Sequence, residues 1–367
     1  TVQITITGAG SITTAANSGK PATQVIVAGL ATEQEVHRVD FSALKEDFNV
    51  DILTIAVSQS GSYDNVNYVQ LYNSVGTQLG PTGGVTLDSS GYAKFSGLNF
   101  NVPKNKAQVI VVKAKMNTMG ERTVATSSDA GTGADSGESI TFTVLASGST
   151  YFRAVGVSSG TVDTQADAAA GSVLVVRKSK PTFAIATPPS TALSNGTVTI
   201  MKFTVAADAN GDVVLGAVTP YITFGDSDGD NLLTMTSGTL YAYDVTGGGS
   251  TQLNTTGMNV LTTTTAAYTI DFDTAQVVSV AAGTTRTFEI RATFTGTELN
   301  DTIQTKFVQD TAALSATTET FANAIADAAD DFIWSDKGAD TNGVTSTEWI
   351  NSYLLYGWPS SVTTLTR

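Results

Sequence analysis

Apolar and polar side chains alternate with a period of two at many places along this chain, and no other feature limits its fold as much. Three examples are residues 1–7 (TVQITIT), 35–41 (EVHRVDF) and 197–203 (TVTIMKF). Successive side chains of a β-strand point to opposite faces, so this pattern is typical of strands with one buried face. Valine and threonine recur in these stretches, and their β-branched side chains favour strand over helix. Only residues 317–330, which are rich in alanine, are expected to form a short helix.

Glycine, asparagine and aspartate interrupt the alternating stretches at short intervals. Two such turns are residues 209–212 (ANGD) and 245–249 (VTGGG). Short strands joined by tight turns are typical of β-sandwiches, whereas α/β folds place helices between their strands. The sequence therefore predicts an all-β protein.

An internal repeat divides the chain. The dipeptide Lys-Pro occurs at residues 20–21 and again at 180–181, and each copy is followed by a similar succession of strands and turns. Near the end of each copy, residues 152–156 (FRAVG) match residues 332–336 (FIWSD). Repeats of this kind indicate tandem structural units. We predict two tandem immunoglobulin-like β-sandwich domains, at residues 21–178 and 179–367, preceded by an N-terminal strand and flexible linker at residues 1–20.

The alternating residues 1–7 are left over when the two copies of the repeat are aligned. They stand where a preceding unit would have its closing strand, just as residues 172–177 precede the second Lys-Pro dipeptide. Such a strand could complete a sheet in another copy by backbone hydrogen bonds, with Val2, Ile4 and Ile6 filling core pockets. Head-to-tail donation that does not close on itself builds a filament. The alternative is an ordinary edge strand of the first sandwich.

The charge and composition of the chain argue against several classes of function. It carries 19 Lys and Arg against 33 Asp and Glu, a net charge of −14, and this excess of acid argues against nucleic-acid binding. It has no cysteine and one histidine, which excludes disulfides, thiolate metal sites and histidine clusters. No apolar run reaches the roughly 18 residues of a membrane helix. The first residue is Thr1, which fits the removal of a secretion signal.

One acidic turn has the spacing of a calcium loop. Asp226, Asp228 and Asp230 place carboxylates at positions 1, 3 and 5, where calcium loops carry oxygen ligands. Asn231 stands where an EF-hand has glycine, and Ser237 where it has its bidentate glutamate, so this turn is not an EF-hand. Calcium is the one cofactor that the sequence suggests, and a solvated acidic turn is the simpler interpretation.

Three asparagines lie in Asn-X-Thr triplets, the acceptor sequence for N-linked glycans. They are Asn195, Asn254 and Asn300. Glycans are therefore an expectation for this chain, although such triplets also arise by chance in a sequence rich in threonine and asparagine.

The C-terminal segment carries a resemblance to a known group of proteins. Residues 332–336 (FIWSD), 347–354 (TEWINSYL) and 357–361 (GWPSS) resemble the C-terminal segments of large, threonine-rich surface proteins of candidate-phylum bacteria, the Patescibacteria or Parcubacteria. This chain departs from them at Ser352, where they have glycine, and at Trp358, where they have leucine. The resemblance implies a cell-surface structural protein, in a surface layer or an appendage, and no catalytic residue.

These observations predict an extracellular structural subunit that assembles with copies of itself into a pilus-like filament by donor-strand complementation. A surface-layer lattice is the alternative within the same class. An adhesin or carbohydrate-binding module is a second class, with Tyr63, Tyr68 and Tyr72 as the aromatic residues for a sugar. An enzyme is not expected: His37 has no triad-like serine or aspartate around it and is expected on the polar face of its strand.

Overall fold

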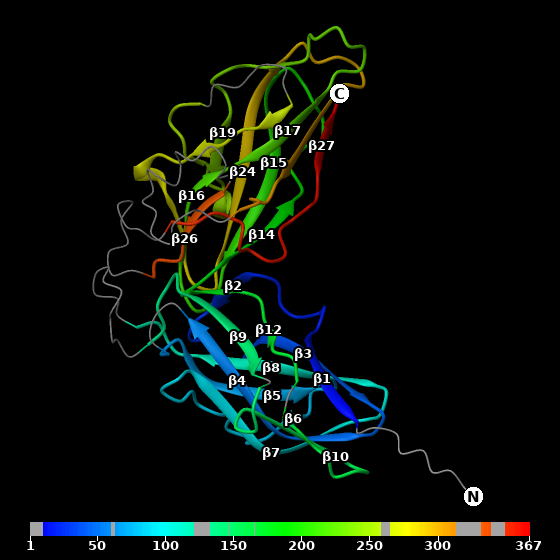
Figure 1. Cartoon of the computed structure of the whole chain (residues 1–367). Helices are drawn as coiled ribbons and strands as arrows, with labels where there is room; N and C mark the ends of the chain where they lie inside the picture. Colours follow the sequence, from blue (N-terminus) through cyan, green and yellow to red (C-terminus); the bar gives the residue numbers. More distant parts are fainter. Residues whose placement is uncertain are drawn as a thin grey trace, which may run out of the picture. The chain divides into compact units, whose positions relative to one another are not determined.

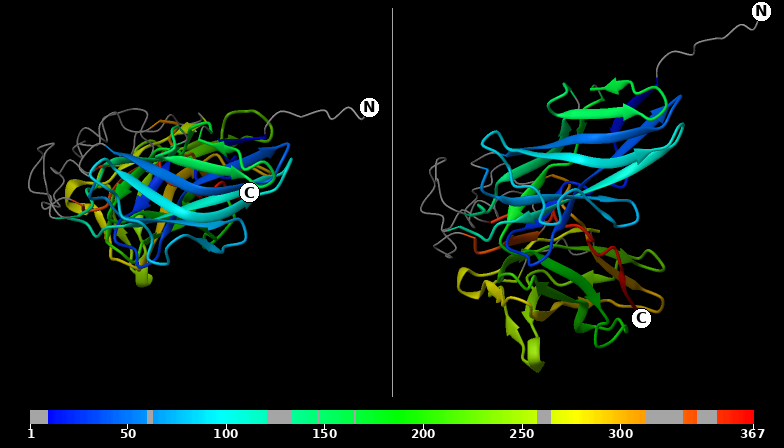
Figure 2. Two further views of the ribbon diagram at one scale, coloured as in Figure 1. Left: turned by 60° about the horizontal axis from the view of Figure 1, so that its bottom comes forward. Right: turned by 90° about the horizontal axis from the view of Figure 1, so that it is seen from below.

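The structure of the chain is a computed structural model that describes residues 10–59, 63–120, 133–145, 147–164, 166–257, 265–312, 332–338 and 349–367. The chain divides into two compact units, which meet in sequence between Val176 and Arg177. Unit 1 is coloured blue to green in Figures 1 and 2, and unit 2 green to red. In the described residues the helical pieces are two 3₁₀ turns, η1 (Thr246–Gly248) and η2 (Thr274–Gln276). The prediction of an all-β fold is confirmed; the helix expected at residues 317–330 lies outside the described residues.

Unit 1 is a sandwich of two sheets. The first sheet has the strand order β1-β3-β8-β5-β6, and the second has the order β11-β10-β4-β9-β13-β2, with β7 paired to β4 and β12 paired to β9. Alternate side chains of both sheets, among them Phe41, Phe48 and Phe142, pack into one core. The strands are β1 (Ser11–Ala16), β2 (Gln24–Val27), β3 (Gln34–Leu44), β4 (Phe48–Gln59), β5 (Val66–Asn73), β6 (Gln78–Leu79), β7 (Tyr92–Val102), β8 (Ala107–Met116), β9 (Ser139–Leu145), β10 (Phe152–Gly156), β11 (Val162–Asp163), β12 (Ala169–Ala170) and β13 (Leu174–Arg177).

Unit 2 has one long sheet and two shorter ones. The long sheet has the order β14-β15-β24-β19-β20, with β18 paired to β24; the shorter ones are β22-β16-β23, with β26 paired to β16, and β21-β17-β25-β27. Stacked and edge-on phenylalanines such as Phe203, Phe288 and Phe307 pack in its core. The strands are β14 (Pro181–Ala186), β15 (Gly196–Ala207), β16 (Val213–Val218), β17 (Pro220–Gly225), β18 (Thr234–Met235), β19 (Tyr241–Asp244), β20 (Thr251–Gln252), β21 (Ala266–Ala267), β22 (Ile270–Asp271), β23 (Val278–Val280), β24 (Thr285–Thr295), β25 (Thr302–Phe307), β26 (Phe332–Ser335) and β27 (Thr363–Thr366).

The strand pairings of the two units correspond. β3 pairs with β8 as β15 pairs with β24, and in both pairs the register shifts once, at Val36 in unit 1 and at Ile200 in unit 2. β10 and β9 pair with the two halves of β4 as β26 pairs with β16 and β25 with β17. Phe152 faces the first half of β4 as Phe332 faces β16, so the sequence match between residues 152–156 and 332–336 is a structural match.

The long strand of the second layer is continuous in one unit and divided in the other. β4 runs for 12 residues, whereas its counterpart ends at Val218 and restarts at Pro220 as β17. Ile55 pairs with Val144 of β9, and Pro220 pairs with Phe307, the corresponding residue of β25. Pro220 is therefore the counterpart of Ile55. Proline has no N–H to donate to a ladder. This one residue therefore accounts for the division of the second layer of unit 2 into two short sheets.

Part of the predicted N-terminal linker is a strand instead. Within residues 1–20, which were assigned to an extension strand and flexible linker, Ser11–Ala16 form β1 and pair with β3 along their whole length. Ile12 and Thr14 are buried, so an alternating pattern is present, but the small residues around them conceal it. Ile12 faces Ala43 of β3 as Pro181 faces Ala207 of β15, which makes β1 the counterpart of β14. Pro181 thus corresponds to Ile12 and not to the proline at position 21.

His37 is buried, and its predicted place on a polar strand face is wrong. The register shift at Val36 sets two residues of β3 against one of β8, which turns both Val36 and His37 inward. The His37 Nε2–H donates to the carbonyl oxygen of Ala169 at 3.0 Å. Burial lowers the pKa of the imidazole, so the ring is neutral at pH 7. Its counterpart in unit 2 is Met201, an ordinary core residue.

Candidate functional site

The predicted calcium turn lies between β17 and β18. Carboxylate oxygens of Asp226, Asp228 and Asp230 lie within 4.8 Å of one another. The two oxygens of Asp226 accept backbone N–H groups of Gly229 at 3.0 Å and Asn231 at 2.7 Å. Burial acts to raise the pKa of Asp226, but these two N–H groups and Asp228 outweigh it and hold that pKa below its usual value. The turn therefore holds its three carboxylates close together and favours the charged form of Asp226, which is engaged with the backbone of the turn.

A second acidic turn faces the first, in the loop that leads into β25. Asp230 and then Asp228 raise the pKa of Glu298 by charge repulsion. Asp301, which is buried, accepts the Ser227 N–H at 3.0 Å and so ties the two turns together. Five carboxylates thus gather at this end of unit 2.

Unit 1 carries an acidic cluster at the corresponding end, which the sequence did not reveal. Asp64, Asp135 and Glu138 place carboxylate oxygens within 4.8 Å of one another. Asp64 follows β4, and the other two precede β9, just as the turns of unit 2 follow β17 and precede β25. The buried Asn65 binds this cluster, since its Nδ2 donates to Glu138 and its Oδ1 accepts the Asp135 N–H at 2.9 Å.

The correspondence extends to single hydrogen bonds. The Glu138 backbone carbonyl accepts the Val176 N–H at 2.8 Å near the end of β13, and the Gly137 N–H donates to the Val176 carbonyl at 2.8 Å. Asp301 accepts the Arg367 N–H at 3.0 Å at the end of β27. Residues 135–138 (DSGE) and 298–301 (ELND) are therefore the same turn, with a positive φ of 90° at Gly137 and 71° at Asn300. An acid-x-x-acid spacing just before β9 and β25 is the sequence signal that could have found both clusters.

In each unit a carboxylate accepts a backbone N–H from the residues just before the first strand. Asp336, at the end of the FIWSD segment, is fully buried 3.7 Å from the buried guanidinium of Arg177, and its Oδ2 accepts the Lys178 N–H at 2.8 Å. In unit 1, Glu46 accepts the Gly10 N–H at 3.3 Å. Hydrogen bonds from the Ser159 hydroxyl and N–H hold the pKa of Glu46 below its usual range. The C-terminal motif thus has a structural use, as an anchor for the start of its own unit.

The predicted glycan sites differ in their exposure. Asn195 and Asn300 lie on exposed turns. Asn254 is 3% exposed, and its amide accepts from the Ala242 N–H at 2.9 Å and donates to the Leu240 carbonyl at 3.1 Å. It holds the interior of unit 2 together and has no access to an external transferase in the folded chain.

The three tyrosines do not form a row for sugar binding. Tyr68 is half-buried, and its hydroxyl donates to Glu33 at 2.7 Å, which raises the pKa of Tyr68 to about 12. The ring of Tyr72 is occupied by the Lys113 ammonium, 4.6 Å from its centroid. Only Tyr63 is exposed, at 40%. This arrangement lacks the free aromatic faces that stack on sugars.

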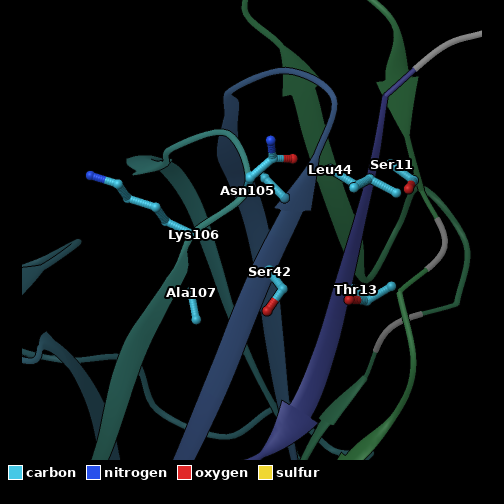
Figure 3. A pocket seen from close by; sticks show the side chains of 8 residues that line it. Ser11, Thr13, Ser42, Leu44, Asn105, Lys106 and Ala107 are labelled. Carbon is cyan, nitrogen blue, oxygen red and sulfur yellow. The ribbon is translucent and has the colours of Figure 1, made fainter.

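Two shallow hollows lie beside the first strands of the units. In unit 1, a hollow of about 310 Å³ lies over β1, β3 and the turn into β8; Figure 3 shows Thr13, Ser42 and Lys106 at its rim. In unit 2, a hollow of about 250 Å³ lies between the end of β14 and the start of β27, with Ile185, Pro188 and Val362 among its lining residues. Both hollows are lined by a mixture of short polar and aliphatic side chains.

The predicted donor residues Val2, Ile4 and Ile6 lie outside the described residues. The correspondence of the two units gives their place in the sequence relative to β1. Leu174 lies 181 − 174 = 7 residues before Pro181, and Thr5 lies 12 − 5 = 7 residues before its counterpart Ile12. By this register β13 (Leu174–Arg177) corresponds to residues 5–8, which overlap the end of the alternating stretch at residues 1–7.

No helix among the described residues is long and apolar enough to cross a membrane. No family model matches the sequence, and no curated protein matches it.

Three solved structures show the kind of protein to which the chain is similar. The C-terminal domain of the AgI/II polypeptide BspA of Streptococcus agalactiae has 7% identity over 81% of this chain and 95% of its own, with a TM-score of 0.20. The serine-rich repeat protein Srr2 of the same species has 12% identity over 81% and 86%, with a TM-score of 0.19. The T6 backbone pilin of Streptococcus pyogenes has 9% identity over 85% and 63%, with a TM-score of 0.18. Scores this low carry no argument about the fold. The all-β fold of this chain rests on the strand pairings described above.

Proposed function

We propose that this chain is an extracellular structural subunit that assembles head-to-tail with copies of itself into a cell-surface filament. In this proposal, residues 1–7 of one copy add as a strand to a sheet of the next copy. The observation that carries the proposal is the correspondence of β1 with β14. The alternating stretch at residues 1–7 thus precedes β1 in sequence as the closing strand β13 precedes β14.

The chemistry of the chain supports this role. Residues 1–7 carry no charged side chain, which suits a strand that is to be buried between sheets. The chain has no cysteine, so its persistence outside a cell would not depend on redox conditions. The resemblance of the C-terminal segment to candidate-phylum surface proteins points to the same location. Nothing in the described clusters calls for catalysis.

Negative-stain electron microscopy of two chains tests the proposal. The truncated chain must begin at Gly10, because β1 belongs to the first sheet and a deletion to residue 20 would damage the fold. We expect filaments from the full chain and monomers from the truncated one. Ile4→Asp, which puts a charge into the strand without shortening it, should also abolish filaments. Filaments from the truncated chain would refute strand donation.

A surface-layer lattice is the second candidate, favoured by the same resemblance. It predicts flat sheets that form equally well without residues 1–9. An adhesin would stay monomeric in both forms and would be retained on a glycan array. The buried or occupied rings of Tyr68 and Tyr72 disfavour that outcome.

We also propose that calcium binds the acidic turn at Asp226, Asp228 and Asp230. A ligand present at 100 times its dissociation constant stabilises the folded state by about 2.7 kcal/mol. Calcium should therefore raise the melting temperature of the chain, and D226N/D228N should remove most of that rise. Asp88 occupies an ordinary exposed turn, so D88N serves as the control. An equal response of both variants, or an equal effect of sodium chloride at matched ionic strength, would rule out this site.

A further inference from the structure

The outer edge of β27 in unit 2 is open at Thr364. β27 pairs with β25 on its inner side, where Leu365 faces Ile303. On its outer side, Thr366 donates its N–H to the Thr191 carbonyl and accepts the Leu193 N–H, both at 2.9 Å. Backbone groups of a strand alternate in direction, so Thr364 points its N–H and carbonyl to the same outer side. Among the described residues, none hydrogen-bonds to those groups of Thr364.

The corresponding edge of unit 1 is covered. There the closing strand β13 has β9 on one side and β2 (Gln24–Val27) on the other. In unit 2 the segment at the place of β2 is residues 187–193 (TPPSTAL), and it reaches β27 by a single bridge, between Ala192 and Thr366. Its two adjacent prolines, Pro188 and Pro189, have no N–H and cannot extend that pairing.

The space beside the unpaired part of this edge has an uncharged lining of short polar and aliphatic side chains. The hollow of about 250 Å³ runs along Ser361–Thr364, and Ile185 and Pro188 form its opposite wall. Val362 is 49% exposed there. No Asp, Glu, Lys or Arg lines the hollow. An uncharged strand could pair with Thr364 and turn its alternate side chains into this hollow.

We infer that the outer edge of β27 is the acceptor for residues 1–7 of a second copy of this chain. The inference rests on the proposed function and specifies its interface. Both units already have closing strands of their own, β13 and β27, so the incoming strand adds to an edge instead of filling a gap. Val2, Ile4 and Ile6 are the alternate side chains that would enter the hollow. The precedent is β2, which covers the same edge in unit 1 from within the chain.

Cysteine cross-linking locates this contact without background, because the chain has no cysteine of its own. The double variant I4C/V362C, oxidised after assembly, should give a ladder of covalent multimers on a non-reducing gel. I6C/V362C and V2C/V362C scan the register. The matched control is I4C/V173C, since Val173, which directly precedes β13, is the counterpart of Thr364 and is 43% exposed.

A backbone variant tests the hydrogen bond itself. Thr364→Pro removes an N–H that points away from β25, a place where an edge strand tolerates proline. The loss of one hydrogen bond should reduce polymer formation roughly tenfold at equal concentration. Val173→Pro in unit 1 should leave polymer formation unchanged. Circular dichroism of both variants verifies that the sandwiches are intact.

The outcomes separate the interface from the function. Filaments with a ladder at V362C support the inference. Filaments whose cross-links form with V173C, or with no Val362 pair, overturn the acceptor edge and leave strand donation standing. An absence of filaments from the unmodified chain overturns the proposed function itself.

Discussion

Unit 1 and unit 2 keep the same strand pairings but differ at the places where those pairings end. Inside the sheets, even the register shift is preserved, at Val36 and at Ile200. At the edges, β2 covers β13 in unit 1, whereas residues 187–193 pair with Thr366 of β27 and leave Thr364 uncovered in unit 2. The difference shows that backbone pairing in the interior tolerates little change, while edges and loop ends accept the changes from which new contacts arise.

The largest expected effect comes from exchanging the residues at the break in the long strand. Ile55 is fully buried on β4 between β7 and β9. Ile55→Pro removes a ladder N–H and part of a buried side chain, and should lower the free energy of unfolding of unit 1 by about 4 kcal/mol. Hydrogen exchange of β4 measures this loss.

The reverse exchange sharpens the same comparison. Pro220→Ile in unit 2 restores an N–H where the strand is already divided, so stability should change by only about 1 kcal/mol. Hydrogen exchange of β16 and β17 provides the measurement. Effects of equal size in the two units would contradict the view that Pro220 is accommodated by a divided sheet.

The anchors of the two first strands should also differ in strength. Asp336→Ala leaves the buried Arg177 without its carboxylate partner, and removing one member of such a pair costs about 3–5 kcal/mol. Glu46→Ala acts at the more exposed anchor of unit 1 and should have a much smaller effect. Urea unfolding followed by tryptophan fluorescence measures unit 2, which holds all three tryptophans, and hydrogen exchange of β1 and β3 measures unit 1. A larger loss from Glu46→Ala would reverse this ranking.

The smallest effect depends on pH and distinguishes His37 from Met201. Burial lowers the pKa of His37 from the ordinary 6.5 of the unfolded chain, so the unfolded state binds the proton more readily. The stability that the neutral ring provides is complete above pH 6.5 and declines as the pH falls, by at most about 1.4 kcal/mol per unit.

Unit 1 should therefore lose protection from hydrogen exchange between pH 6.5 and 5. His37→Met, which copies the residue of unit 2, should remove that dependence. A pH dependence that persists in the variant would assign it to carboxylates instead.

The sequence predicted the strand content and the match of residues 152–156 with 332–336, because alternation and aromatic positions are local patterns. It placed the start of the repeat wrongly, since the Lys-Pro dipeptides at 20–21 and 180–181 are more conspicuous than the correspondence of Ile12 with Pro181. It also placed His37 on the wrong face, because a one-residue register shift cannot be seen in the alternation itself.

The acidic clusters show what sequence reasoning could and could not find. Asp226, Asp228 and Asp230 are adjacent in sequence, and the structure brings their carboxylates together as expected. Asp64 and Glu138 are separated by 138 − 64 = 74 residues and meet only because β4 and β9 are neighbours in one sheet. Contacts of this kind follow from topology and not from spacing.

The two prolines beside β27 have a consequence for handling the protein before assembly. A strand edge with unpaired N–H and carbonyl groups pairs with any extended segment that reaches it, including those of unrelated or unfolded chains. A population of monomers that carries such an edge is exposed to aggregation in proportion to its concentration and to the time it waits. Prolines 188 and 189 keep the edge available by preventing the chain from covering it. In the proposed assembly, the same two residues would therefore limit how much unassembled protein can accumulate.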